Sequence, residues 1–191
     1  MMNGFDKNYI LEKLSQIEDG ETAVSHLVVK GAYDDEVIDD IKNLAEETGN
    51  LVVTEYAEVG KNGYEATGIF NFLPVDDDEL TEILTANIVV SDEIDEIGIY
   101  DMYKLVNMVN NRLVAGRFVL SDDEKILAYR NNIILSRELD NKEALNLAVD
   151  QLLGALGEVS LWVDILMGYN DGDMSPEECI EAINENSVFA E

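Results

Sequence analysis

Residues 103–120 read YKLVNMVNNRLVAGRFVL, and residues 126–130 read ILAYR. Apolar residues recur at helical spacing through 97–113, so this segment predicts an amphipathic helix. The β-branched and aromatic run at 117–121 predicts a strand, and the segment 125–135 predicts a longer strand. The acidic turn Asp122-Asp123-Glu124 joins them, so a helix followed by an antiparallel hairpin is expected here.

The segments on either side extend this pattern. A helix is expected over 34–48 and a long helix over 141–166, both from apolar residues at helical spacing. Strands are expected at 51–56 and 64–73, joined by Gly60-Lys61-Asn62-Gly63, and at 87–91; residues 80–84 are interpreted as a short helical turn. A final short helix is expected after Ser175, with Ser175 as its N-cap and Pro176 in its first turn.

The N-terminal region is less clearly patterned. Residues 5–17 predict a helix, whereas residues 22–30 fit either a helix or a strand, and their β-branched content favours a strand. Residues 1–32 are interpreted as an extension, 33–168 as one α+β domain, and 169–191 as a short helix and tail. The expected fold is α+β, an antiparallel sheet with helices packed on it, in the order α-β-β-β-α-β-β-α.

Composition excludes several functions. The 191 residues include 41 acidic and 12 basic ones, so the formal net charge is −29. Such a charge disfavours binding to nucleic acid and to anionic membranes, whereas 47% hydrophobic residues disfavour a disordered chain. No secretory signal and no uninterrupted run of ~18 apolar residues are present. The single cysteine, Cys179, forbids an intramolecular disulfide, and a cytoplasmic location is expected.

The charge is unevenly distributed. Residues 104–142 contain seven of the basic residues and five acidic ones, which gives +2 against −31 for the rest of the chain. All four arginines lie in this window. Two interpretations remain open: an anion-binding or acidic-peptide surface around Arg117, or, as the favoured interpretation, arginines that pair with acidic helices elsewhere in the fold.

No motif predicts a catalytic, metal or cofactor site. Residues 76–79 and 170–178 are rich in carboxylates but lack the ligand spacing of a calcium loop. His26 has no nucleophile with a recognisable signature beside it, and Glu177, Glu178 and Glu181 should raise the pKa of the Cys179 thiol and suppress its reactivity. No Gly-rich phosphate loop is present.

The stretch quoted first resembles the YbjN-domain family. The resemblance is carried by paired asparagines in the helix, a Gly-x-Phe strand entry and a Tyr-Arg pair, at Asn107, Asn110 or Asn111, Gly116, Phe118, Tyr129 and Arg130. The element order from about 34 to 167 is similar to the type III secretion chaperone-like fold. This resemblance implies a non-enzymatic protein with a chaperone-like or regulatory role, usually dimeric, that binds extended segments of other proteins.

The first hypothesis is therefore an acidic, cytoplasmic protein-interaction module that acts as a homodimer with an unidentified protein partner and no cofactor. Its expected interaction surface comprises Arg117, Phe118, Tyr129, Arg130 and Trp162. The alternative is a small-ligand-binding protein or enzyme, which requires Arg117, Tyr129 and Arg130 to converge on a pocket. A weaker third hypothesis is a mimic of nucleic-acid charge that occupies a basic partner.

Overall fold

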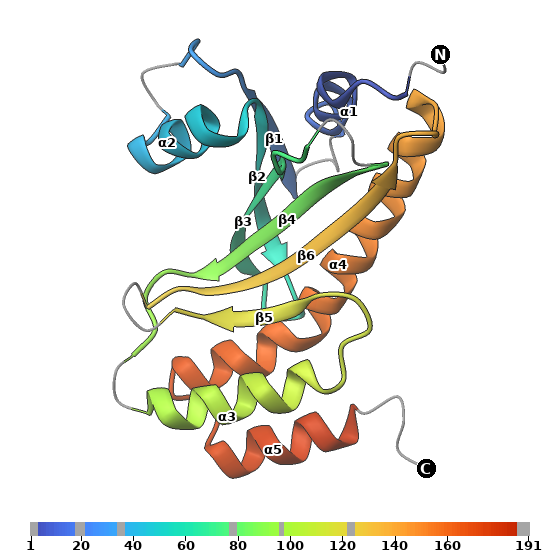
Figure 1. Cartoon of the computed structure of the whole chain (residues 1–191). Coiled ribbons are helices and arrows are strands. Elements are labelled where there is room, and N and C mark those ends of the chain that lie inside the picture. The colour runs from blue at the N-terminus through green and yellow to red at the C-terminus, as the bar shows by residue number, and fades with distance from the viewer. Residues whose placement is uncertain are drawn as a thin grey trace.

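The computed structural model describes residues 4–17, 22–33, 37–76, 80–95, 98–121 and 125–186 (Figure 1). Its elements follow one another as α1 Lys7–Leu14, β1 Ala23–Val28, α2 Asp39–Thr48, β2 Leu51–Val59, β3 Tyr64–Phe72, β4 Thr81–Ser91, α3 Ile99–Asn110, β5 Arg117–Leu120, β6 Leu127–Ser136, α4 Asn141–Asn170 and α5 Pro176–Glu185. The strands form one sheet in the order β1-β2-β3-β4-β6-β5, and every neighbouring pair is antiparallel. The expected α+β class is confirmed, as is the order α-β-β-β-α-β-β-α from α2 to α4.

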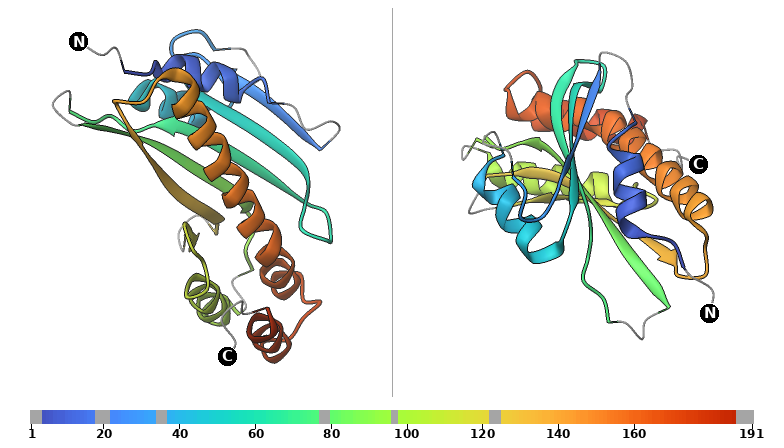
Figure 2. Two further views of the ribbon diagram at one scale, coloured as in Figure 1. Left: turned by 90° about the vertical axis from the view of Figure 1, so that its right-hand side faces the viewer. Right: turned by 90° about the horizontal axis from the view of Figure 1, so that it is seen from above.

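Helices cover the two faces of the sheet unequally. The long helix α4 runs along one face, with α1 at one end and α3 and α5 at the other, whereas α2 lies on the opposite face (Figure 2). The covered face carries the two large clusters of buried apolar residues. On the opposite face, called the open face below, α2 packs only over one end of the sheet, around Leu51, Val53 and Ile69.

The N-terminal segment is integrated into this fold. Residues 23–28 form β1, which pairs with β2 at the edge of the sheet, so the preference for a strand at 22–30 is confirmed. Ile10 and Leu11 of α1 are buried in one of the core clusters together with residues of α4. The region expected as an extension therefore contributes both an edge strand and a core helix.

The expected helical turn at 80–84 is wrong. Residues 81–84 belong to β4, an 11-residue strand that pairs with β3 on one side and β6 on the other. A central strand satisfies its backbone groups on both edges, and this tertiary pairing outweighs the weak local pattern. The helix expected at 34–48 is described from Asp39 onward; residues 34–36 lie outside the described residues.

The long C-terminal helix exceeds its expected length. It extends over 30 residues, to Asn170, and Gly154 and Gly157 do not interrupt it; Asp140 and Glu143 form a capping box at its start. The short helix α5 begins as expected, with Ser175 as N-cap and Pro176 at the first turn. The expected absence of an uninterrupted run of ~18 apolar residues holds for α4, because Asp150, Glu158 and Asp164 interrupt its apolar residues. One 18-residue window of α4 has a mean hydropathy of 1.4, with 44% of that window buried in the fold, a combination that core helices of soluble proteins also show.

Candidate functional site

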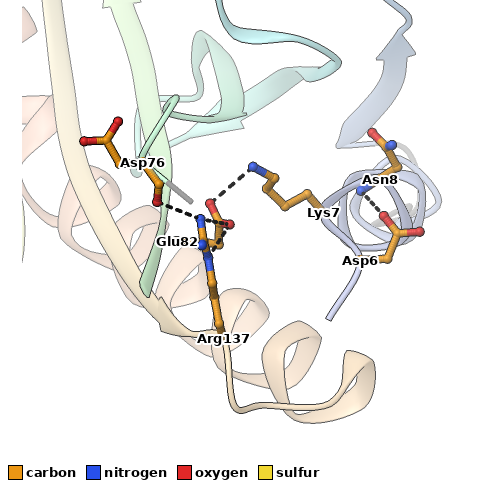
Figure 3. A network of polar contacts seen from close by, with 6 residues as sticks. All are labelled: Asp6, Lys7, Asn8, Asp76, Glu82 and Arg137. Carbon is orange, nitrogen blue, oxygen red and sulfur yellow. Dashed lines mark hydrogen bonds and ion pairs between the residues drawn. The ribbon is translucent and has the colours of Figure 1, made fainter. Parts of the chain in front are cut away.

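The four arginines divide into two that hold the fold together and two that do not. Arg137, at the end of β6, belongs to the first kind (Figure 3). Its Nε and Nη2 atoms lie 2.8 and 2.7 Å from Oε1 of Glu82, and Lys7 Nζ lies 3.2 Å from the other carboxylate oxygen. Glu82 is a buried residue of β4, so this cluster ties α1, β4 and the end of β6 together.

Arg112 is the second structural arginine. Its guanidinium donates to the Met108 carbonyl oxygen at 2.7 Å and to Asn184 Oδ1 at 2.7 Å. The side chain therefore joins the end of α3 to α5. Arg137 thus pairs with a carboxylate inside the fold, on strand β4 and not on a helix, whereas the described contacts of Arg112 are to uncharged oxygens.

Arg117 and Arg130 differ from both. They are exposed, and each is the other's direct partner across the β5–β6 pair. Within the described ranges, neither guanidinium has an ion pair or a hydrogen bond to another side chain or to the backbone. The acidic turn expected at 122–124 lies outside the described residues.

Strand register places both arginines in ordered rows of side chains on the open face. One row crosses all six strands as His26, Val53, Ile69, Asn87, Arg130 and Arg117. The next row reads Val28, Leu51, Asn71, Thr85 and Asn132. Because α2 covers only the β1–β3 end of these rows, Asn87, Asn132 and the two arginines remain accessible, whereas Asn71 and Thr85 are buried.

These uncovered groups line a groove of about 810 Å³, called the arginine groove below. Leu44 and Thr48 of α2 form one wall, and the loop before β5 forms the other. The floor consists of sheet residues, among them Asn71, Thr85, Asn87, Val89, Arg117, Ala128, Arg130 and Asn132. None of the described lining residues is acidic, although 41 of the 191 residues in the chain are. The described lining of the groove is therefore positively charged, in a strongly negative protein.

Three members of the expected interaction surface lie elsewhere. Phe118 and Trp162 are each 2% exposed and Tyr129 is fully buried, so none of them belongs to the surface. Alternation along β5 and β6 directs Phe118 and Tyr129 to the covered face, where the two rings pack edge to face at 5.4 Å. The predicted surface is thus corrected to Arg117 and Arg130 alone, and Tyr129 does not converge with them.

On the covered face, the Tyr129 hydroxyl joins α4 to the loop before β5 by hydrogen bonds. Its hydroxyl donates a short hydrogen bond to Glu158 of α4 and accepts one from the Gly116 N–H at 2.9 Å. Glu158 also accepts from the N–H groups of Val114 at 2.8 Å and Ala115 at 3.3 Å. Burial, and then Glu158, raise the pKa of Tyr129, which keeps this hydroxyl protonated. Helix α4 therefore holds the loop that leads into β5 in place through Glu158.

Asn110 holds the other side of β5. Its side-chain amide donates to the Phe118 carbonyl oxygen at 2.9 Å and accepts from the Phe118 N–H at 2.7 Å. A side chain thus supplies the pairing that a further strand would supply at this sheet edge. Among the asparagines of the family resemblance, Asn110 makes this contact, whereas Asn107 and Asn111 are exposed.

The other candidate residues do not form a site. His26 is exposed on the open face, opposite Val53. Cys179 is buried, and burial together with Glu178 raises the pKa of its thiol to about 11. In the described part of the chain, no three His, Cys, Asp or Glu side chains converge to hold a metal ion. Residues 77–79 of the acidic run at 76–79 lie outside the described residues.

The sequence reasoning missed the polar floor of the groove. Asn87 and Asn132 flank the arginines, and Thr85 Oγ1 donates to Asn71 Oδ1 at 2.7 Å. The signal was present in β6, where Arg130, Asn132 and Ile134 alternate with buried residues. The corresponding pattern in β4 was not recognised, because residues 81–84 in the first half of this strand were interpreted as part of a helical turn.

Comparison of the chain with protein-family models, curated proteins and solved structures gave no match.

Proposed function

We propose that this protein is a non-catalytic protein-interaction module that binds an acidic, extended segment of a partner protein in the arginine groove. The observation that carries the proposal is the pair Arg117 and Arg130, directly opposed on an open sheet face in a groove whose described lining residues include no acidic one. Guanidinium groups recognise carboxylates with paired N–H donors, which a lysine cannot reproduce. The described lining leaves the carboxylates of a ligand without competing negative charge.

The remaining lining fits an extended chain. Asn87 and Asn132 sit beside the arginines and carry donors and acceptors for peptide groups. Val89, Ala128 and Val119 form the neighbouring apolar row, which suits the alternate side chains of a strand-like segment. An acidic peptide with apolar residues at alternate positions therefore matches the groove.

The net charge of −29 sets the conditions of binding. At low salt the whole molecule repels an acidic peptide before it reaches the groove. At physiological salt the Debye length is ~8 Å, so distant charges are screened more strongly than charges in direct contact. We expect association to become faster, not slower, when salt rises from 10 to 150 mM.

The test is fluorescence anisotropy with a labelled ten-residue peptide of alternating Glu and Val. We expect saturable binding, and the R117Q/R130Q variant to bind at least ~10-fold more weakly, equivalent to ~1.4 kcal/mol. The matched control is K61Q/K142Q, which removes the same charge at exposed lysines outside the groove. Equal weakening in both variants, or no binding to the unsubstituted protein, would contradict the proposal.

A small anionic ligand is the second candidate, because a groove of this volume also suits small molecules. Citrate serves as the probe. Citrate that binds more tightly than the peptide and depends on both arginines would favour this candidate.

A homodimer and a cytoplasmic location remain part of the proposal. Size-exclusion chromatography with light scattering at micromolar concentration tests the dimer, and a purely monomeric species would remove it. The monomer, if found, leaves the arginine groove unaffected, since the groove belongs to one chain.

A further inference from the structure

A second cavity, called the α4 cavity below, lies on the other face of the sheet. Its volume is about 330 Å³, and it is bounded by β1 and β2, the end of α1 and the middle of α4. It occupies the place where the two large core clusters approach each other, so neither cluster fills the space beneath α4. A cavity of this size is in the range of small-molecule sites.

The walls of the α4 cavity are apolar on the helix side. The helices contribute Leu14 from α1 and Leu152 and Leu156 from α4, and Phe70 of β3 adds an aromatic ring. Among the described lining residues, Glu58, which is exposed, is the one charged side chain, and no described lysine, arginine or histidine borders the cavity. An anionic ligand would meet no countercharge here, whereas an uncharged apolar molecule would lose only its contact with water.

Hydroxyl groups gather on the strand side. Ser25 of β1 and Thr54 of β2 are cross-strand partners whose hydroxyl oxygens lie 2.8 Å apart. Tyr56 lies two residues further along the same face, and burial raises the pKa of its hydroxyl to about 12, so it remains a donor at physiological pH. This cluster gives the cavity one polar end that suits a single hydroxyl or amine.

Gly157 keeps the helix side of the cavity open. It lies in the interior of α4, where glycine costs ~0.5–1 kcal/mol relative to alanine, and a Cβ there would meet nothing within 4 Å. Packing within the fold therefore does not require glycine at this position. Gly154 has the same open surroundings on the same helix, but it does not line the cavity.

From this geometry we infer that the α4 cavity binds a small uncharged molecule with an apolar body and one hydroxyl or amine. The apolar body packs against α4 and Phe70, and the polar group reaches the hydroxyls of Ser25, Thr54 and Tyr56. The site is independent of the arginine groove, which lies on the opposite face of the sheet.

The test uses the uncharged fluorophore N-phenyl-1-naphthylamine, titrated against the full chain. We expect one saturable site from which 1-octanol displaces the fluorophore and octanoate, of equal chain length, does not. The G157L variant places a side chain over the cavity and should weaken fluorophore binding at least tenfold. The matched variant G154L gains the same side chain away from the cavity and should bind as before.

Two further variants keep the outcome clear. T54V preserves shape and removes a hydroxyl, so it should weaken displacement by octanol more than binding of the fluorophore. R117Q/R130Q should leave fluorophore binding unchanged, which separates this site from the arginine groove. Absence of saturable binding, equal loss in G154L and G157L, or displacement by octanoate as effective as by octanol would each overturn the inference.

Discussion

Arg117 of β5 and Arg130 of β6 are direct partners across an antiparallel strand pair, on the face of the sheet that α4 does not cover. Like charges in such positions destabilise a sheet by up to ~1 kcal/mol. No described carboxylate offsets this repulsion. Within the described part of the chain the pair therefore makes no stabilising contact, and this is the observation on which the proposed binding rests.

The first prediction separates the two kinds of arginine by stability. R130Q should leave the free energy of unfolding unchanged or raise it by up to ~1 kcal/mol, because it relieves repulsion. R137Q should lower it by ~1.5–3 kcal/mol, because buried Glu82 keeps only Lys7 as a charged partner. Urea unfolding of both variants at pH 7 measures the contrast. An R130Q variant that is as unstable as R137Q would show that Arg130 has a structural partner.

The second prediction concerns two glycines with opposite surroundings. A Cβ at Gly116 would lie 2.3 Å from the ring end of Tyr129 and 2.7 Å from the Arg130 carbonyl oxygen, so G116A must displace the buried ring. We expect a loss of at least ~2 kcal/mol. G154A meets no atom within 4 Å in a helix interior and should gain ~0.5–1 kcal/mol. Thermal unfolding of the two variants supplies the comparison, and destabilisation by G154A would mean that another surface closely approaches this part of α4.

Much of the fold followed from local pattern. The capping residues of α4 and α5, the hairpin at Gly60–Gly63 and the spacing of α3 each depend on neighbours in sequence, so they were predictable. The first half of β4 was not, because its strand character comes from pairing on both edges with β3 and β6. The place of α1 and β1 in the main sheet and core likewise depends on contacts distant in sequence.

The site was predictable only in part. Charge distribution pointed to Arg117 and Arg130, but strand alternation alone decides that Tyr129, adjacent to Arg130, faces the opposite side. The contributions of Asn71 and Thr85 require the register of three strands. The α4 cavity has no sequence signal, since it arises from how α1, β2 and α4 meet.

The third prediction tests the two hydrogen bonds that join the Asn110 side chain to the backbone of Phe118 in the edge strand β5. In N110D the side chain still accepts from the Phe118 N–H but no longer donates to the Phe118 carbonyl oxygen, which then faces a carboxylate. We expect a loss of ~1–3 kcal/mol at pH 7. N107D, an equal charge change at an exposed position of the same helix, should change stability by less than ~0.5 kcal/mol. Urea unfolding of both variants measures the contrast; an equal loss of stability in N110D and N107D would show that the lost bond to the Phe118 carbonyl oxygen is not the cause.

The fourth prediction is a loss of stability in alkali. Burial raises the pKa of Tyr56 from 10.0 to about 12 and, with a smaller effect of Glu178, that of Cys179 from 9.0 to about 11. Below pH 9 both groups are protonated in the folded and unfolded chain, so their contribution is constant. Above pH 9 the unfolded chain releases the Cys179 proton, and above pH 10 it also releases the Tyr56 proton. The folded chain retains both protons in this range, so rising pH favours unfolding. For Tyr56 this should lower the free energy of unfolding by up to ~2–3 kcal/mol between pH 10 and 12.

Urea unfolding from pH 8 to 11 measures this loss of stability. The Y56F variant should lose less stability above pH 10 than the unsubstituted protein, whereas Y100F, at an exposed tyrosine, should not. A Y56F curve parallel to that of the unsubstituted protein would show that Tyr56 ionises equally in both states.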